Sequence, residues 1–109
     1  METITYDEFK KMDIRIGTIR EVESIPDADK LLKFQIDFGE LGILQILSGI
    51  KEYYPDFQQL VGKQALYIVN LEPRTIRGFE SRGMLLAVGD DKPIFLSPES
   101  PVPTGSSVR

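Results

Sequence analysis

The chain has 109 residues and a mass of 12.3 kDa, the size of one domain that can bury its own core. It contains neither Cys nor His, which excludes disulfides, thiolate chemistry, an imidazole base and zinc sites built from those residues. Because 13 Lys+Arg oppose 17 Asp+Glu, the formal net charge is −4, and nucleic-acid binding would have to depend on a local basic patch.

Two further features concern the compartment. No apolar run approaches the roughly 20 residues that a membrane-spanning helix needs. The first ten residues carry three acidic side chains and no apolar stretch of the signal-peptide type. We therefore expect a cytoplasmic protein without a membrane partner, in which residues 1–109 form a single domain.

The N-terminal residues predict a short helix. Thr5 and Glu8 have the spacing of a capping box, in which each side chain bonds the other residue's backbone amide. Tyr6, Phe9 and Met12 then follow three residues apart on one helical face. This apolar stripe needs a cover, and the sequence leaves two open: the rest of the domain, or a second subunit.

The period changes to that of a β-strand at Ile14. Ile14 and Ile16 alternate with Arg15, and the phase slips after Gly17. One extra residue at a glycine predicts a β-bulge in a long, bent first strand. Residues 24–30 then read as a polar loop.

Residues 32–38 form the clearest strand. Apolar side chains alternate there with polar ones and are predicted to face the core: Leu32, Phe34, Ile36 and Phe38. A four-residue turn at 39–42 leads into a returning strand at 43–47, which is apolar on both faces except at Gln45.

The remaining elements complete a recognisable order. They are a short helix over 55–62, strands over 63–69, 84–88 and 94–96, a polar loop over 73–83 and an extended tail from 97 onward. This order predicts an all-β fold: a five-stranded OB-fold Greek-key barrel with a short N-terminal helix, a short helix between strands three and four, and an extended C-terminal segment. Such barrels bind ligands between the loops predicted at 24–30 and 73–83.

The sequence offers little for catalysis. Asp27 with Asp29, and Asp90 with Asp91, are ordinary turn-formers that lack a third oxygen donor nearby. No G-x-S-x-G elbow, Walker motif or dinucleotide-binding glycine pattern is present. We expect a non-enzymatic protein with no cofactor and no metal site.

Nucleic-acid binding has local support. The segment 73–83 places Arg74, Arg77 and Arg82 within nine residues, and arginine suits phosphates because its planar fork of donors binds them in pairs. Lys30 and Lys33 fall near the same predicted groove. Phe79 could stack on a base if it is exposed. The alternative is that these are solvated surface charges.

Five motifs give the chain a resemblance to a known family. In order they are residues 26–31 (PDADKL), 48–50 (SGI), 61–63 (VGK), 70–74 (NLEPR) and 77–87 (RGFESRGMLLA). Together they resemble the tRNA-binding domain family, from about Phe9 to Val108. That family includes the C-terminal appendage of methionyl-tRNA synthetases, free-standing structure-specific tRNA-binding proteins, endothelial-monocyte-activating-type cytokine domains and CsaA-type export chaperones.

The resemblance implies an OB-fold that forms a homodimer through residues 1–12 and 97–109. It implies a non-catalytic module that recognises tRNA by shape, either free-standing or associated with an aminoacyl-tRNA synthetase, methionyl-tRNA synthetase above all. Motif matching carries these residues over: Lys30, Ser48, Asn70, Arg74, Arg77, Ser81 and Met84.

Roles follow from the chemistry of these side chains. Lys30, Arg74 and Arg77 are expected to contact phosphates, and Ser81 a sugar or phosphate. Met84 is expected to form an apolar platform. Asn70 suits the anchoring of the 73–83 loop better than contact with RNA. With Lys33 and Arg82 added, the candidate RNA-binding set has nine members.

Several positions depart from the family's usual residues. Ile25 replaces a histidine, Leu44 a basic residue, and Glu72 and Thr75 stand where lysine is frequent. Each change removes positive or polar character, so we expect weak binding that salt suppresses. The apolar residues of 43–47 keep open a CsaA-type chaperone that binds unfolded peptides. A docking module that no longer binds RNA is a third possibility.

Overall fold

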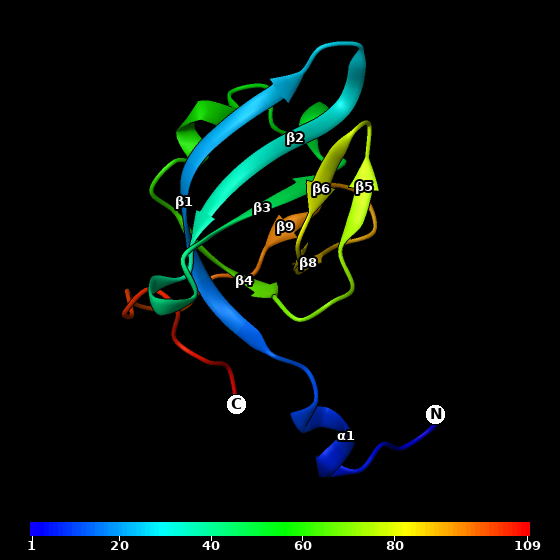
Figure 1. Cartoon of the computed structure of the whole chain (residues 1–109), viewed down its shortest axis with the longest axis vertical. Coiled ribbons are helices and arrows are strands. Elements are labelled where there is room, and N and C mark those ends of the chain that lie inside the picture. Colours follow the sequence, from blue (N-terminus) through cyan, green and yellow to red (C-terminus); the bar gives the residue numbers. More distant parts are fainter.

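The computed structural model describes all 109 residues, and most of its elements are strands (Figure 1). In chain order they are α1 (Tyr6–Lys10), β1 (Ile14–Ile25), β2 (Ala28–Asp37), the 3-10 helix η1 (Gly39–Leu41), β3 (Ile43–Ser48), the 3-10 helices η2 (Lys51–Tyr53) and η3 (Phe57–Leu60), β4 (Gln64–Ile68), β5 (Arg74–Ile76), β6 (Phe79–Ser81), β7 (Met84–Leu85), β8 (Ala87–Val88) and β9 (Ile94–Phe95). None of the helices has the length and apolar composition that a membrane-spanning helix requires.

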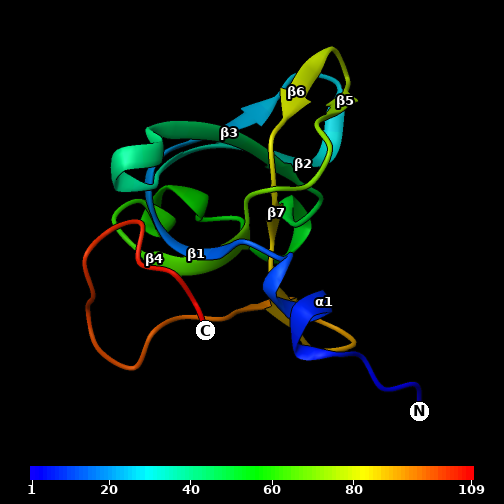
Figure 2. The ribbon, with the colours of Figure 1, turned by 60° about the horizontal axis from the view of Figure 1, so that its bottom comes forward.

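Five strands form one antiparallel sheet in the order β3-β2-β1-β4-β7. The sheet curls round until its two edges meet, where the backbone amide of Arg82 donates to the Gln45 carbonyl of β3 at 2.8 Å (Figure 2). The predicted all-β, five-stranded fold class is therefore confirmed. The predicted helix between strands three and four is present as η3, a 3-10 helix.

The first strand is long and bent, as predicted, but its bulge lies elsewhere. The first half of β1 pairs with β4, and the rest pairs with β2. The register between β1 and β2 shifts between Ile19 and Glu21, which places the extra residue at Arg20. Gly17 has a different role: a Cβ there would lie 2.5 Å from Ile36 Cγ2, so glycine lets the two strands pack closely.

The core follows the predicted alternation of β2. All four apolar residues expected to face inward are at most 1% exposed: Leu32, Phe34, Ile36 and Phe38. They pack with Ile19, Val22, Ile46, Ala65 and Tyr67 from the neighbouring strands. The polar residues between them stay at the surface because successive side chains of a strand point to opposite faces.

Both predicted loops are strands joined by tight turns. Where the sequence indicates a loop over 24–30, β1 and β2 run to within two residues of each other, around Pro26 and Asp27. Asp27 has a positive φ of 64°, a conformation that the second central residue of a type II turn requires. The loop expected at 73–83 is the β5–β6 hairpin. Polar residues in these ribbons line a solvated face, which a one-dimensional pattern does not separate from a loop.

The C-terminal strands also differ in detail. The strand expected over 84–88 is interrupted at Leu86, whose amide donates to the Leu66 carbonyl. After the interruption, β8 pairs with β9 across the predicted turn at 89–92. The tail is extended, as expected, and lies along the chain's own β1: Ile16 donates to Ser106 at 2.9 Å and Gly105 donates back at 2.8 Å.

α1 projects from the barrel. The predicted capping box is confirmed, with Thr5 and Glu8 each bonding the other's amide at 3.1 Å. None of its residues is buried, and Tyr6 and Met12 are 71% and 41% exposed. Figures 1 and 2 both show the helix beside the barrel, away from the core. The sequence left open whether the domain itself or a second subunit covers the apolar stripe of Tyr6, Phe9 and Met12. The domain itself does not cover it.

The core contains one orphaned polar atom, which generates a prediction. The Tyr67 hydroxyl is buried without a hydrogen-bond partner, and burial raises the pKa of Tyr67 above its ordinary value. We expect Tyr67→Phe to raise the free energy of unfolding in urea by about 1 kcal/mol, because the desolvated hydroxyl is removed.

The matched control is Tyr54→Phe. The native Tyr54 hydroxyl donates to the Pro93 carbonyl at 2.6 Å. That variant should lose about 1 kcal/mol. Equal losses in both variants would contradict the assignment.

Candidate functional site

The arginine-rich segment forms a β-hairpin that stands at the side of the barrel. We call residues 74–82, which comprise β5, β6 and Arg82, the arginine hairpin (Figure 1). Its strands pair from Arg74 with Ser81 to Ile76 with Phe79. The turn consists of Arg77 and Gly78, both with positive φ, at 52° and 83°. Two such residues define a type I′ turn, which suits the twist of a hairpin.

A second, smaller core seats the hairpin. Ile76 and Phe79 on its inner face pack against a buried cluster formed by Ile25, Ala28 and Leu47. This cluster lies under the β1–β2 turn and the end of β3. The hairpin is thus fixed by apolar contacts, and its outer residues are left in solvent.

The arginines of the hairpin differ in their pairing. Arg74 and Arg77 are exposed, and neither forms an ion pair. Arg82 Nε lies 3.7 Å from Glu80 Oε1, and both side chains are more than half exposed. Such a solvated pair contributes little, at most about 1 kcal/mol. Two guanidinium groups are therefore free to bind an anion, and the third is only loosely held.

The two lysines of the candidate set occupy different environments. Lys33 is only 17% exposed; its Nζ lies 4.4 Å from the Phe79 ring centroid and 3.6 Å from Glu23 Oε2. The Lys33 side chain therefore helps to fix the hairpin against β2 through Phe79. Phe79 is covered and not the free stacking surface that the sequence left open. Lys30 is exposed and unpaired at the start of β2.

Ser81 is largely buried, at 5% exposed. Its expected contact with a sugar or phosphate stays a prediction. Its Oγ accepts from the Leu47 amide at 3.0 Å and lies 3.4 Å from the Gly83 carbonyl. The hydroxyl thus helps to close the barrel beside the bond between Arg82 and Gln45.

Two other members of the set lie at the surface without an assigned bond. Ser48 ends β3 opposite Leu32 and is half-buried. Met84 in β7 is 48% exposed, opposite Ile68. Their proposed contacts with RNA stay predictions.

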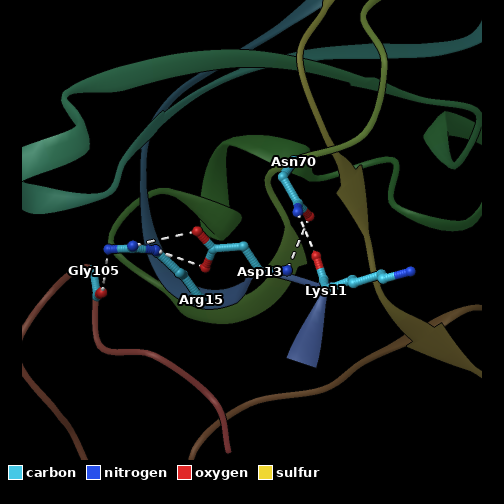
Figure 3. A network of polar contacts seen from close by, with 5 residues as sticks. All are labelled: Lys11, Asp13, Arg15, Asn70 and Gly105. Carbon is cyan, nitrogen blue, oxygen red and sulfur yellow. Dashed lines mark hydrogen bonds and ion pairs between the residues drawn. The ribbon is translucent and has the colours of Figure 1, made fainter. Parts of the chain in front are cut away.

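Asn70 has both ends of its amide occupied (Figure 3). Its Oδ1 accepts from the Asp13 amide at 2.9 Å, and its Nδ2 donates to the Lys11 carbonyl at 2.6 Å. Asp13 in turn forms a two-point ion pair with Arg15, and this hydrogen bonding raises the pKa of Arg15. Asn70 therefore anchors the N-terminal segment, not the 73–83 loop as the sequence suggested.

A groove beside the hairpin was missed by the sequence reasoning. It has a volume of about 530 Å³ and is lined by Leu41, Leu44, Val69, Asn70, Leu71, Glu72, Pro73 and Arg82. The apolar residues of the 39–44 and 69–73 segments were its only signal in the sequence. No group of three or more acidic side chains that could hold a metal ion exists in the chain.

Comparison with known sequences confirms the expected resemblance. The family model described as "Putative tRNA binding domain" matches residues 14–107. The methionine–tRNA ligase of Porphyromonas gingivalis is 46% identical over 110 residues, which cover 99% of this chain and 16% of the ligase. That of Thermococcus kodakarensis is 41% identical and covers 100% of this chain and 15% of the ligase. The chain thus spans about 16% of the length of such relatives.

Solved structures give the same picture. A methionyl-tRNA synthetase-related protein from Pyrococcus horikoshii superimposes with a TM-score of 0.88 at 33% identity, covering 100% of both chains. The chaperone CsaA from Bacillus anthracis has the same TM-score at 29% identity, covering 99% of this chain and 100% of its own.

The turn of the arginine hairpin yields a prediction about stability. Asn tolerates positive φ and with Gly78 makes the preferred type I′ pair, whereas a β-branched residue is strained there. We expect Arg77→Asn to keep or raise the melting temperature. Arg77→Val, which removes the same charge, should lower the free energy of unfolding by about 1–2 kcal/mol. Indistinguishable thermal melts for the two variants would show that the turn does not impose this conformation.

Proposed function

Because the chain belongs to the tRNA-binding domain family, we propose that it binds tRNA by shape and phosphate contacts through the arginine hairpin. The domain is a binding module and supplies no reacting group. Arg74 and Arg77 contact phosphates, and Lys30 and Arg82 extend the same surface. Recognition by shape and phosphate contacts gives little sequence preference, since phosphates carry no sequence information.

The observation that carries this proposal is the free guanidinium at the hairpin tip. Arg77 occupies a left-handed backbone conformation that asparagine or glycine adopts at lower cost. A residue kept where it is locally unfavourable, with a charged group unpaired and exposed, is typical of a functional position. Arg77 also lies in the turn that joins β5 and β6.

We further propose that two copies act together in the cytoplasm. Residues 1–12 and 97–109 form the interface, and the exposed apolar stripe of α1 supports this assignment. Each barrel of this acidic chain offers a modest basic surface, and joining two such surfaces raises the overall affinity without new contacts. The module serves methionyl-tRNA synthetase, as an associated subunit or a free-standing tRNA-binding protein.

One observation favours a second function. The groove beside Arg82 contains exposed Leu41 and Leu71, and Ile43 nearby is 59% exposed. Apolar surface of this kind suits an unfolded peptide. A peptide-binding chaperone of the CsaA type is therefore the alternative function.

The test is the salt dependence of binding to bulk tRNA at ~50 mM and ~200 mM salt. We expect saturable binding that weakens with salt. Arg77→Asn and Arg74→Gln should each lower the affinity several-fold and reduce the slope of log K against log salt by about 0.7–0.9, the value of one lost phosphate contact. Arg77→Asn is informative because its turn stays favourable.

The control is Lys92→Gln, which makes the same change in net charge outside the arginine hairpin and outside the segments proposed for the dimer interface. Lys92 is exposed and lies in the turn between β8 and β9. An equal loss of affinity in this variant would mean that only the overall charge matters. Binding of an unstructured peptide, with no response to tRNA, would favour the chaperone instead.

A further inference from the structure

The orientation of α1 is not set by packing. The helix has five residues, fewer than an isolated helix needs for stability, and none of them is buried. The direction of the helix must therefore be set by residues 11–13, which join α1 to β1. We call these residues the joint.

Asn70 holds this joint at two points. Its amide donates to the Lys11 carbonyl and accepts from the Asp13 amide, so it bridges the peptide groups on either side of Met12 (Figure 3). A neutral side chain that donates and accepts at once is required, and only Asn and the longer Gln provide one in amide form. The Asp13 carboxylate does not replace Asn70 in holding the joint, because both of its oxygens accept from Arg15.

The same residue lies at the root of the arginine hairpin. Asn70 is two residues beyond the end of β4 and four residues before Arg74. The 57 to 59 residues that separate it from the joint in sequence mean that only the fold brings the two together. One side chain thus connects α1 to the segment that leads into the hairpin.

We propose that Asn70 is a positioning residue that fixes the direction of α1 relative to the arginine hairpin. This inference rests on the proposed function, in which α1 contacts a second copy and the hairpin contacts tRNA. Dimer formation and tRNA binding then depend on the same amide. Loss of the amide frees α1, weakens the dimer and lowers the tRNA affinity that two joined surfaces supply.

The test uses the full chain with two disruptive substitutions at this position and one conservative control. Asn70→Ala removes both bonds. Asn70→Asp keeps an acceptor for the Asp13 amide, but its carboxylate faces the Lys11 carbonyl and repels it. The control is Asn70→Gln, which keeps a donor and an acceptor in amide form.

We expect dimer dissociation constants, measured by sedimentation, to rise about tenfold over the native value for both disruptive variants. The control Asn70→Gln should lie nearer to the native value, because its amide still donates and accepts. The tRNA affinities should follow the same order. A loss in Asn70→Gln as large as that in Asn70→Ala would show that the two bonds of the amide are not the cause.

Hydrogen exchange in α1 separates this inference from the proposed function. The amides of Phe9 and Met12 should exchange faster in Asn70→Ala whether or not the protein dimerises or binds tRNA. If the native chain neither dimerises nor binds tRNA, the proposed function fails. Hydrogen exchange then still tests whether Asn70 fixes α1. If both disruptive variants match the native protein in exchange, dimerisation and tRNA affinity, the positioning role of Asn70 is wrong.

Discussion

The outer edge of β3 has to be paired, and the way in which it is paired decides where the arginine hairpin stands. An open strand edge presents unpaired amides and carbonyls, which cost free energy when buried and invite association when exposed. Here the Gln45 carbonyl and the Leu47 amide are taken by Arg82 and Ser81. Those residues end the hairpin, so the same contacts that close the barrel also place the arginine hairpin.

The seat of the hairpin explains why a chain with a formal charge of −4 can still present cations locally. Lys33 covers Phe79 and Ser81 bonds β3, so these residues hold the hairpin. Because these other residues fix the hairpin, Arg74 and Arg77 need no structural partner and remain in solvent. Arg74 shares the face of Ile76 and Phe79 but lies at the exposed start of β5, and Arg77 lies in the turn, so both guanidinium groups extend beyond the seat.

Sequence reasoning succeeded where the period of hydrophobicity is unambiguous. The alternation over 32–38, the capping box at Thr5 and the order of elements were sufficient for the fold class, since each rests on interactions between near neighbours. It was wrong at 24–30 and at 73–83, because the solvent-facing residues of a two-stranded ribbon are as polar as those of a loop. It also misplaced the bulge, since Gly17 is required by packing against Ile36 and not by an extra residue.

The sequence by itself determined the barrel, the family and the presence of three clustered arginines, because strand periodicity, turn residues and motifs are written in adjacent positions. Tertiary structure alone decided which of the nine candidate side chains have partners within the chain. Ser81, Lys33 and Asn70 are each occupied by a residue between 34 and 59 positions away or by a ring across the small second core. A hydrogen bond or a covered ring depends on the distance between side chains in space. The pattern of adjacent residues does not give that distance when the partners lie far apart in sequence.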